Sequence, residues 1–436
     1  MQRLILIMIV VATTFDYLSK GDRWGRFAVL PREATYIAEL LGVVALLWVV
    51  FLGTQNRFRY VRPAYWFIFG ALLVTICAGI VLNRVEPGPI FAGIRSYLRA
   101  MPWFFIGAVV AFTESDIRKQ LRLVLAIALV QIPLAIEQRM HGFGGDLGYV
   151  SYTGDATSGT FLISSILSLF LICCLCVLVA FYLRRRITKW QFALAFVALL
   201  TPTLINETKG TLIFLPLGLL ITVLVAVESR QRIRAVLIAS ALTVFAGALF
   251  VPVYDFFAKE SFPGIVEFLT DTEAIESNLQ KNLDIGSVSE TPAGRLDSVL
   301  VPLRELSADP ATLFFGLGVG NVSDSALGLQ FVGEHHQKFS LFLRHAFASI
   351  VLELGVLGLV LLVTLLWCIF ADSVVVARRD AGLWGAFAAA MAGVTAVVTM
   401  SIIYKDLVGH ISMSFLFWYF SGLVAAHRMR LAAVSR

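Results

Sequence analysis

The link Asn206-Glu207-Thr208-Lys209-Gly210 joins two apolar segments and places two charges where a membrane would end. In one interpretation Lys209 is a cation directed at an anionic lipid headgroup, with Glu207 beside it. The alternative is an ordinary turn, in which the two side chains form an i, i+2 charge pair.

Arg295 stands in a long polar stretch, at the first turn of a predicted amphipathic helix. The helix begins near Thr291-Pro292 and is short or kinked at Pro302. Its apolar residues recur at three- and four-residue spacing: Leu296, Val299, Leu300, Leu303 and Leu306. A guanidinium binds phosphate in a bidentate manner that lysine cannot reproduce. The alternative is a solvated arginine on an exposed helix.

Three histidines precede or enter a long apolar run at residues 346–370: His335, His336 and His345. The pair Arg344-His345 lies at the mouth of this run, and Glu353 follows about two turns deeper. Histidine accepts or orients protons near neutral pH, and ionisable groups at membrane depth are usually functional. The alternatives are a headgroup-wetted His345, solvated His335 and His336, and a Glu353 carboxylate that pairs with a neighbouring helix.

The composition determines where these residues must lie. The chain has 436 residues, of which 58% are hydrophobic and 15% charged, and its mean hydropathy is +0.84. These values indicate a polytopic membrane protein. The net charge of +6 comes from basic residues in short loops, so it does not indicate nucleic-acid binding. The five cysteines lie in predicted membrane segments without metal-ligand spacing, so we expect no disulfide, metal or other cofactor.

Hydropathy predicts an all-α fold of about twelve transmembrane helices, with a large, partly helical loop between the ninth and tenth. We divide the chain into helices 1 to 9 (residues 1–253), the loop (254–345), and helices 10 to 12 with a short tail (346–436). The predicted spans are 3–18, 34–53, 64–82, 97–113, 121–136, 160–183, 190–206, 210–227, 235–253, 346–370, 383–404 and 410–426. The first, fourth and fifth are short, so one of them is either re-entrant or longer at its flanks.

Lysine and arginine in the short loops predict the orientation, because cytoplasmic loops retain them. Basic residues recur on one side in loops 54–63, 114–122, 184–189, 228–234 and 371–382 and in the tail. Both termini are then cytoplasmic. The loop 254–345 has six Lys/Arg and thirteen Asp/Glu and faces outward. The basic first outer loop, 19–33, is the exception.

The order of these features resembles the O-antigen ligase and polymerase superfamily of bacterial membrane glycosyltransferases. The resemblance covers roughly residues 200–370. It rests on Lys209 before a membrane helix, Ala293-Gly294-Arg295-Leu296 in the outer loop, Gly316-Leu317-Gly318, and a histidine before Leu352-Glu353-Leu354-Gly355-Val356-Leu357-Gly358. Ligases usually have arginine at position 209 and a histidine-asparagine pair where this chain has His345-Ala346. The Glu-Thr-Lys link and the Arg-His pair look more like exopolysaccharide polymerases of the superfamily.

The resemblance implies transfer of a glycan from undecaprenyl pyrophosphate to an acceptor hydroxyl, without a metal, at the periplasmic face of the inner membrane. It implies that His345, Arg295 and His336 are the catalytic residues. Lys209, Arg344, Arg295 and Glu207 would then bind the pyrophosphate. The expected partners are the lipid-linked oligosaccharide, a glycan acceptor, the bilayer, and chain-length regulator and export proteins.

Two alternatives remain open. A ligase or protein O-oligosaccharyltransferase of the same superfamily would differ only in its acceptor. A transporter or flippase of lipid-linked sugars belongs to another class, but transporters commonly place charges near the midplane. This chain places its charges at the outer boundary, beside a polar segment that a transporter does not require.

Overall fold

In the part of the chain that the structure, a computed structural model, describes, the regular secondary structure consists of helices. Residues 23–24, 57, 145–156, 207, 229–230, 259–295, 326, 344, 406–409 and 435–436 are not described. The first half contains α1 (Gln2–Lys20), α2 (Ile37–Asn56), α3 (Pro63–Leu82), α4 (Pro87–Leu98), α5 (Met101–Val109), α6 (Glu114–Gly144), α7 (Ser164–Leu183), α8 (Lys189–Ile205), α9 (Thr211–Ala226) and α10 (Arg232–Ala258). The second half contains α13 (Asp297–Leu306), α14 (Pro310–Phe315), α15 (His336–Phe339), α16 (Ala346–Arg379), α17 (Leu383–Ser401) and α18 (Ile411–Val434).

Eight of the described helices are long and apolar enough to cross a membrane, which agrees with a helical membrane protein. They are α1, α2 with the short turn before it, α3, α6, α7, α10, α16 and α17. The helices α8 and α9 are apolar but shorter, with 17 and 16 residues. The predicted short span at 121–136 is the middle of α6, which has 31 residues. The total of twelve spans stays a prediction.

The predicted span at 97–113 has a different structure. It is occupied by two short helices, α4 and α5, which meet at Arg99 and Ala100. Pro102 lies in the first turn of α5 and cannot donate a helical hydrogen bond, so a new helix begins there. The break places Arg95 in an ion pair with Glu39 of α2, and Arg99 lies 3.5 Å from the same carboxylate.

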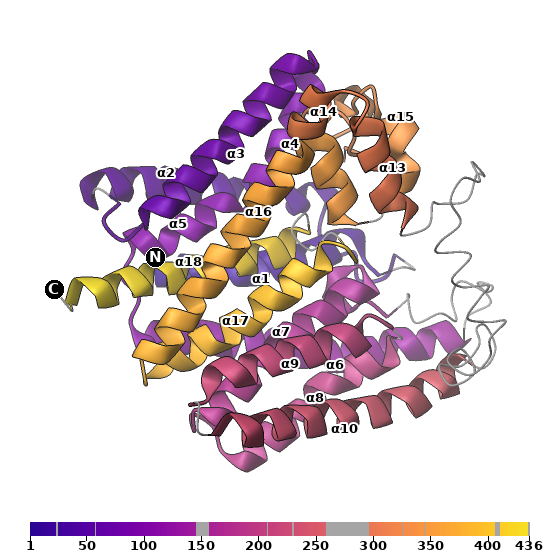
Figure 1. Ribbon diagram of the computed structural model, residues 1–436. Helices are drawn as coiled ribbons and strands as arrows, with labels where there is room; N and C mark the ends of the chain where they lie inside the picture. Colours follow the sequence, from indigo (N-terminus) through magenta and orange to yellow (C-terminus); the bar gives the residue numbers. More distant parts are fainter. Residues whose placement is uncertain are drawn as a thin grey trace.

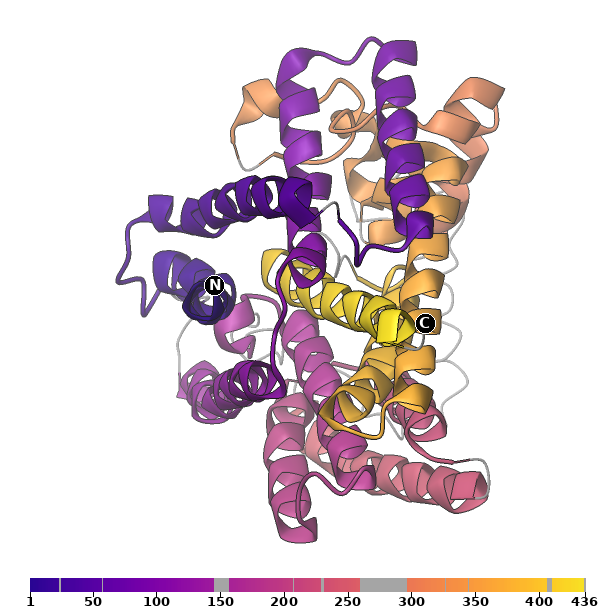
Figure 2. The same cartoon turned by 90° about the vertical axis from the view of Figure 1, so that its left-hand side faces the viewer.

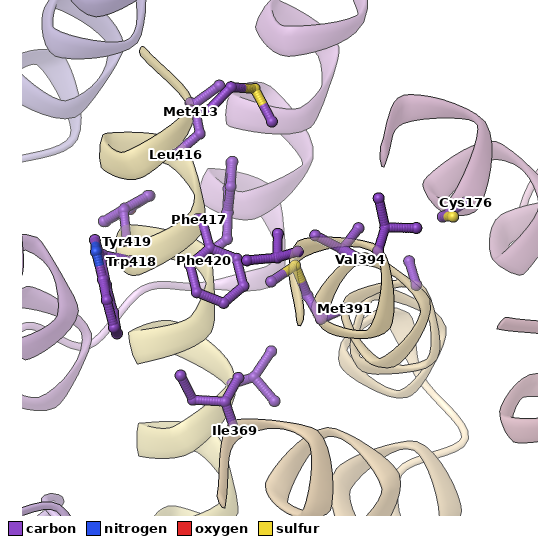
Figure 3. Packing of buried hydrophobic residues seen from close by; sticks show 14 of the residues in the cluster. Cys176, Ile369, Met391, Val394, Met413, Leu416, Phe417, Trp418, Tyr419 and Phe420 are labelled. Atoms are coloured by element: carbon purple, nitrogen blue, oxygen red, sulfur yellow. The ribbon is translucent and has the colours of Figure 1, made fainter. Parts of the chain in front are cut away.

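The long helix α16 runs obliquely through the molecule and organises its second half (Figure 1). It packs against α17, α18 and α3 along its length, and against α13 and α14 at its beginning. The view turned by 90° shows α3 and α4 side by side, joined at the end where the segments of the large loop gather (Figure 2). A large apolar core joins α5, α7, α9, α17 and α18, and part of it is drawn in Figure 3.

A second, smaller core holds the described part of the large loop on α16. It consists of Leu306, Val322, Phe339, Val351 and Leu352, which come from α13, the following loop, α15 and the first turns of α16. The predicted amphipathic helix is therefore present as α13, with Pro302 inside it and Leu306 buried.

Helix α16 is kinked at Gly355, where φ is 68° and ψ is −174°. A Cβ at this position would lie 2.3 Å from the carbonyl oxygen of Phe314, and one at Gly316 would lie 2.5 Å from the backbone of Glu353. Both sites therefore require glycine. The kink follows the first turns of α16, in which Val351 and Leu352 belong to the smaller core while Ala346, Ile350 and Leu354 belong to the large one.

Candidate functional site

His345 lies at the start of α16, where it is the N-cap residue in an extended conformation. Its side chain is almost fully buried, with 1% exposed, and its ring centroid lies 6.4 Å from that of Phe347. The amide of Phe347 donates a hydrogen bond of 2.9 Å to the carbonyl of Ile402, just beyond α17. The beginning of α16 is thus fixed to the end of α17.

Lys209 lies in the link between α8 and α9, and its side chain is exposed. Its ammonium is 5.6 Å from the centroid of the Tyr254 ring, near the end of α10. A cation over an aromatic face is stabilised by the ring quadrupole, so Tyr254 helps to orient Lys209.

Asn206 fixes the position of this link through hydrogen bonds to α7. Its side chain is buried and hydrogen-bonded to α7: Nδ2 donates to the carbonyl of Ser164 (3.0 Å), and the hydroxyl of Ser168 donates to Oδ1 (3.1 Å). Oδ1 also accepts from the amide of Thr208 at 3.2 Å. The backbone immediately before Lys209 is therefore anchored to a membrane helix.

Tyr404 connects the two regions. Its ring lies directly against Gly210, where a Cβ would come within 2.7 Å of it, and it packs edge-on against Phe214 of α9. Tyr404 is two residues after Ile402, the residue that binds the start of α16. The starts of α9 and α16, which are far apart in sequence, therefore meet at the end of α17.

His336 lies in a different part of the fold, at the first position of α15. Its Nδ1 is 2.8 Å from the carbonyl oxygen of Val322. A carbonyl only accepts hydrogen bonds, so Nδ1 is the nitrogen that donates to Val322. Within the described residues Nε2 has no hydrogen-bond partner. The ring of His336 is thus oriented by its Nδ1, which is bonded to the loop.

Glu353 holds the same loop on α16. Its Oε1 accepts the amides of Ser323 (2.8 Å) and Val322 (3.3 Å), and its side chain is 1% exposed. Beside it, the amide of Leu317 donates to the carbonyl of Leu352 at 2.7 Å. Besides these amides, the side chain of Tyr97, on the neighbouring helix α4, is a hydrogen-bond partner of the carboxylate. The expected alternative for Glu353, a buried carboxylate that pairs with a neighbouring helix, therefore agrees with the structure in part, and backbone amides of the loop are its further partners.

Two asparagines complete this loop, and the sequence analysis did not identify either. Asn321 accepts the amide of Glu334 at 3.1 Å and donates to the carbonyl of Leu317 at 3.0 Å. Asn83, at the end of α3, donates to the carbonyl of Gly316 at 2.9 Å. The sequence signal for Asn321 was a polar amide directly after a glycine-rich stretch, and the signal for Asn83 was a polar amide at the end of an apolar helix.

Three predicted site residues lie outside the described residues: Arg295, Arg344 and Glu207. The structure therefore places Gly210, before α9, and Phe347, in α16, against residues just after α17, and it holds His336 and Glu353 around the loop 316–323. No protein-family model matches this chain, and no curated protein matches it.

Proposed function

We propose that this chain polymerises undecaprenyl-pyrophosphate-linked oligosaccharide repeat units into a surface polysaccharide or exopolysaccharide. The reaction takes place at the periplasmic face of a bacterial inner membrane, and both termini are cytoplasmic. The observation that supports it best is the meeting of the starts of α9 and α16 at Tyr404. Lys209 lies just before α9 and His345 caps α16, so this contact supports the proposal that the two side chains serve one site.

The chemistry is a displacement at an anomeric carbon. The acceptor hydroxyl oxygen forms a bond to this carbon while the bond to the pyrophosphate oxygen breaks, and the hydroxyl proton passes to a histidine. Undecaprenyl pyrophosphate leaves with the electron pair, so negative charge increases on its phosphates. Lys209, Arg295 and Arg344 stabilise this charge through charge-assisted hydrogen bonds, with Glu207 beside Lys209.

Two histidines are candidates for the proton acceptor. We assign His345, because it caps the long helix α16, and side chains on rigid elements hold catalytic geometry best. His336 is the second candidate, because its Nε2 has no hydrogen-bond partner within the described residues. His335 provides the matched control, since it neighbours His336 and contributes its backbone amide to Asn321.

The test uses purified protein, lipid-linked repeat units as donor, and a chelator in place of added divalent metal. Polymer length is measured on a gel. We expect His345→Ala to lower the rate on the order of a hundredfold, with donor binding retained, because a general base contributes about this much. His335→Ala and His336→Ala should have milder effects. Full activity of His345→Ala together with loss in His336→Ala would transfer the role to His336.

A deletion strain separates this function from its alternatives. A missing polymerase leaves single lipid-linked repeat units on the outer leaflet, and surface polymer disappears. A missing ligase or protein O-oligosaccharyltransferase leaves long lipid-linked polymer instead. A missing flippase traps single repeat units on the inner leaflet, where an external glycosidase cannot reach them.

A further inference from the structure

A cavity of about 580 Å³ opens between α6, α7, α8 and the start of α17. It lies at the helix ends that the short-loop charges predict to be cytoplasmic, opposite the candidate site. Four arginines contribute to its lining, and all four are exposed: Arg118, Arg122, Arg185 and Arg186. The rest of the lining is mostly apolar and includes Leu121, Val124, Val177 and Phe181.

The four arginines form an uncompensated positive group. Within the described part of the chain, none of them forms an ion pair with a carboxylate. Arg118 and Arg122 are four residues apart on α6, an unfavourable spacing for like charges. Arg186 donates to the carbonyl of Ala381 at 2.8 Å, which directs it across the cavity toward α17. The arrangement therefore favours a bound anion.

Arginines in short loops are by themselves explained by the orientation of the helices in the membrane. The apolar lining of the cavity is a second, independent observation that points to a ligand. Four of its lining residues also line a second hollow of about 60 Å³, deeper between α7, α17 and α18: Leu121, Val124, Cys174 and Val177. The lining of this second hollow is entirely hydrophobic, and in Figure 3 Phe417 and Phe420 of α18 point toward Met391 of α17. The cavity therefore has arginines at one end and apolar residues at the other, next to the second hollow.

We propose that this cavity binds an anionic phospholipid of the surrounding bilayer. Its phosphate lies among the four arginines, because guanidinium groups form bidentate hydrogen bonds with phosphate oxygens. One acyl chain enters the apolar hollow between α6 and α7 and points toward α17 and α18. Basic pockets between transmembrane helices bind anionic headgroups in this way. A zwitterionic lipid would bring an ammonium group toward four guanidinium groups.

The test uses the delipidated full-length chain in detergent. Phosphatidylglycerol and phosphatidylcholine with the same acyl chains are compared by native mass spectrometry and thermal unfolding. We expect phosphatidylglycerol to bind more tightly and to raise the Tm more. Arg118→Gln with Arg122→Gln, and Arg185→Gln with Arg186→Gln, should each weaken its binding roughly thirtyfold, because each basic residue near a headgroup contributes about 1 kcal/mol and each pair therefore about 2 kcal/mol.

Two further variants act as controls. Lys119→Gln removes a neighbouring exposed charge of α6 that does not line the cavity, so it should leave binding unchanged. Val177→Phe narrows the apolar hollow and should weaken phosphatidylglycerol binding while all four arginines remain. Equal binding of the two lipids, unchanged binding in both arginine pairs, or equal stabilisation by inorganic phosphate alone would overturn the proposal.

Discussion

Replacement of Glu353 tests whether this carboxylate holds the loop 316–323 or takes part in the chemistry. Glu353→Ala removes the acceptor of two backbone amides, one of them on the fully buried Val322. A hydrogen bond to a charged group contributes about 1.5–3 kcal/mol, and a buried donor without a partner costs about 1–3 kcal/mol. The bond to Val322 is long, at 3.3 Å, and Ser323 is reached by water, so we expect a loss of about 2–4 kcal/mol.

Hydrogen exchange measured by mass spectrometry is the direct assay. In Glu353→Ala, peptides that cover Val322 and Ser323 should exchange faster, and the Tm of the protein in detergent should fall. Glu353→Gln keeps an oxygen that can accept both amides, so it should retain most of the protection. Asp324→Ala is the matched control, since Asp324 is an exposed carboxylate just after this loop, and it accepts the amide of its neighbour Ser325.

Two results would refute this assignment. Unchanged exchange in Glu353→Ala would mean that the carboxylate does not hold the loop. Loss of polymer in Glu353→Gln, with exchange and Tm preserved, would mean that Glu353 takes part in the reaction.

The other predictions concern backbone, chemistry and topology. Gly355→Ala should lower the Tm and reduce the free energy of unfolding by at least about 2 kcal/mol, because φ is positive there and a carbonyl oxygen of α14 lies 2.3 Å from the added Cβ. Gly70→Ala is the control and should leave the Tm unchanged, because nothing lies within 4 Å of a Cβ at that position. Arg295→Lys should lose most activity in the polymer assay, because lysine lacks the planar fork; wild-type output would make Arg295 a solvated surface residue. A reporter fused after Glu290 should be active outside and one at Arg379 inside; a cytoplasmic Glu290 would invalidate the site assignment.

The helices were largely predictable from the sequence, because apolar composition over about twenty residues directly indicates a membrane span. The predicted span at 97–113 was wrong for a local reason. Hydropathy is averaged over a window of residues and does not register Arg99 and Pro102, where the segment divides into α4 and α5. The predicted helix after Arg295 is present from Asp297 onward, because its apolar spacing was regular.

The contacts of the candidate site were much less predictable. The orientation of the His336 ring depends on a carbonyl of Val322, and the role of Glu353 depends on the same loop folding back onto α16. The packing of Gly210, which follows Lys209, depends on Tyr404, a residue just after a third helix, α17. Such pairings join residues that are distant in sequence, and one sequence contains no periodic signal for them.

The kink at Gly355 has a consequence for how this protein can be recombined. Before it, Val351 and Leu352 belong to the smaller core, while Ala346, Ile350 and Leu354 already belong to the large apolar core, as do many residues after the kink. The five buried residues of the smaller core all precede Gly355 in the chain. A chimera that crosses over at this glycine therefore keeps the smaller core on one side of the junction.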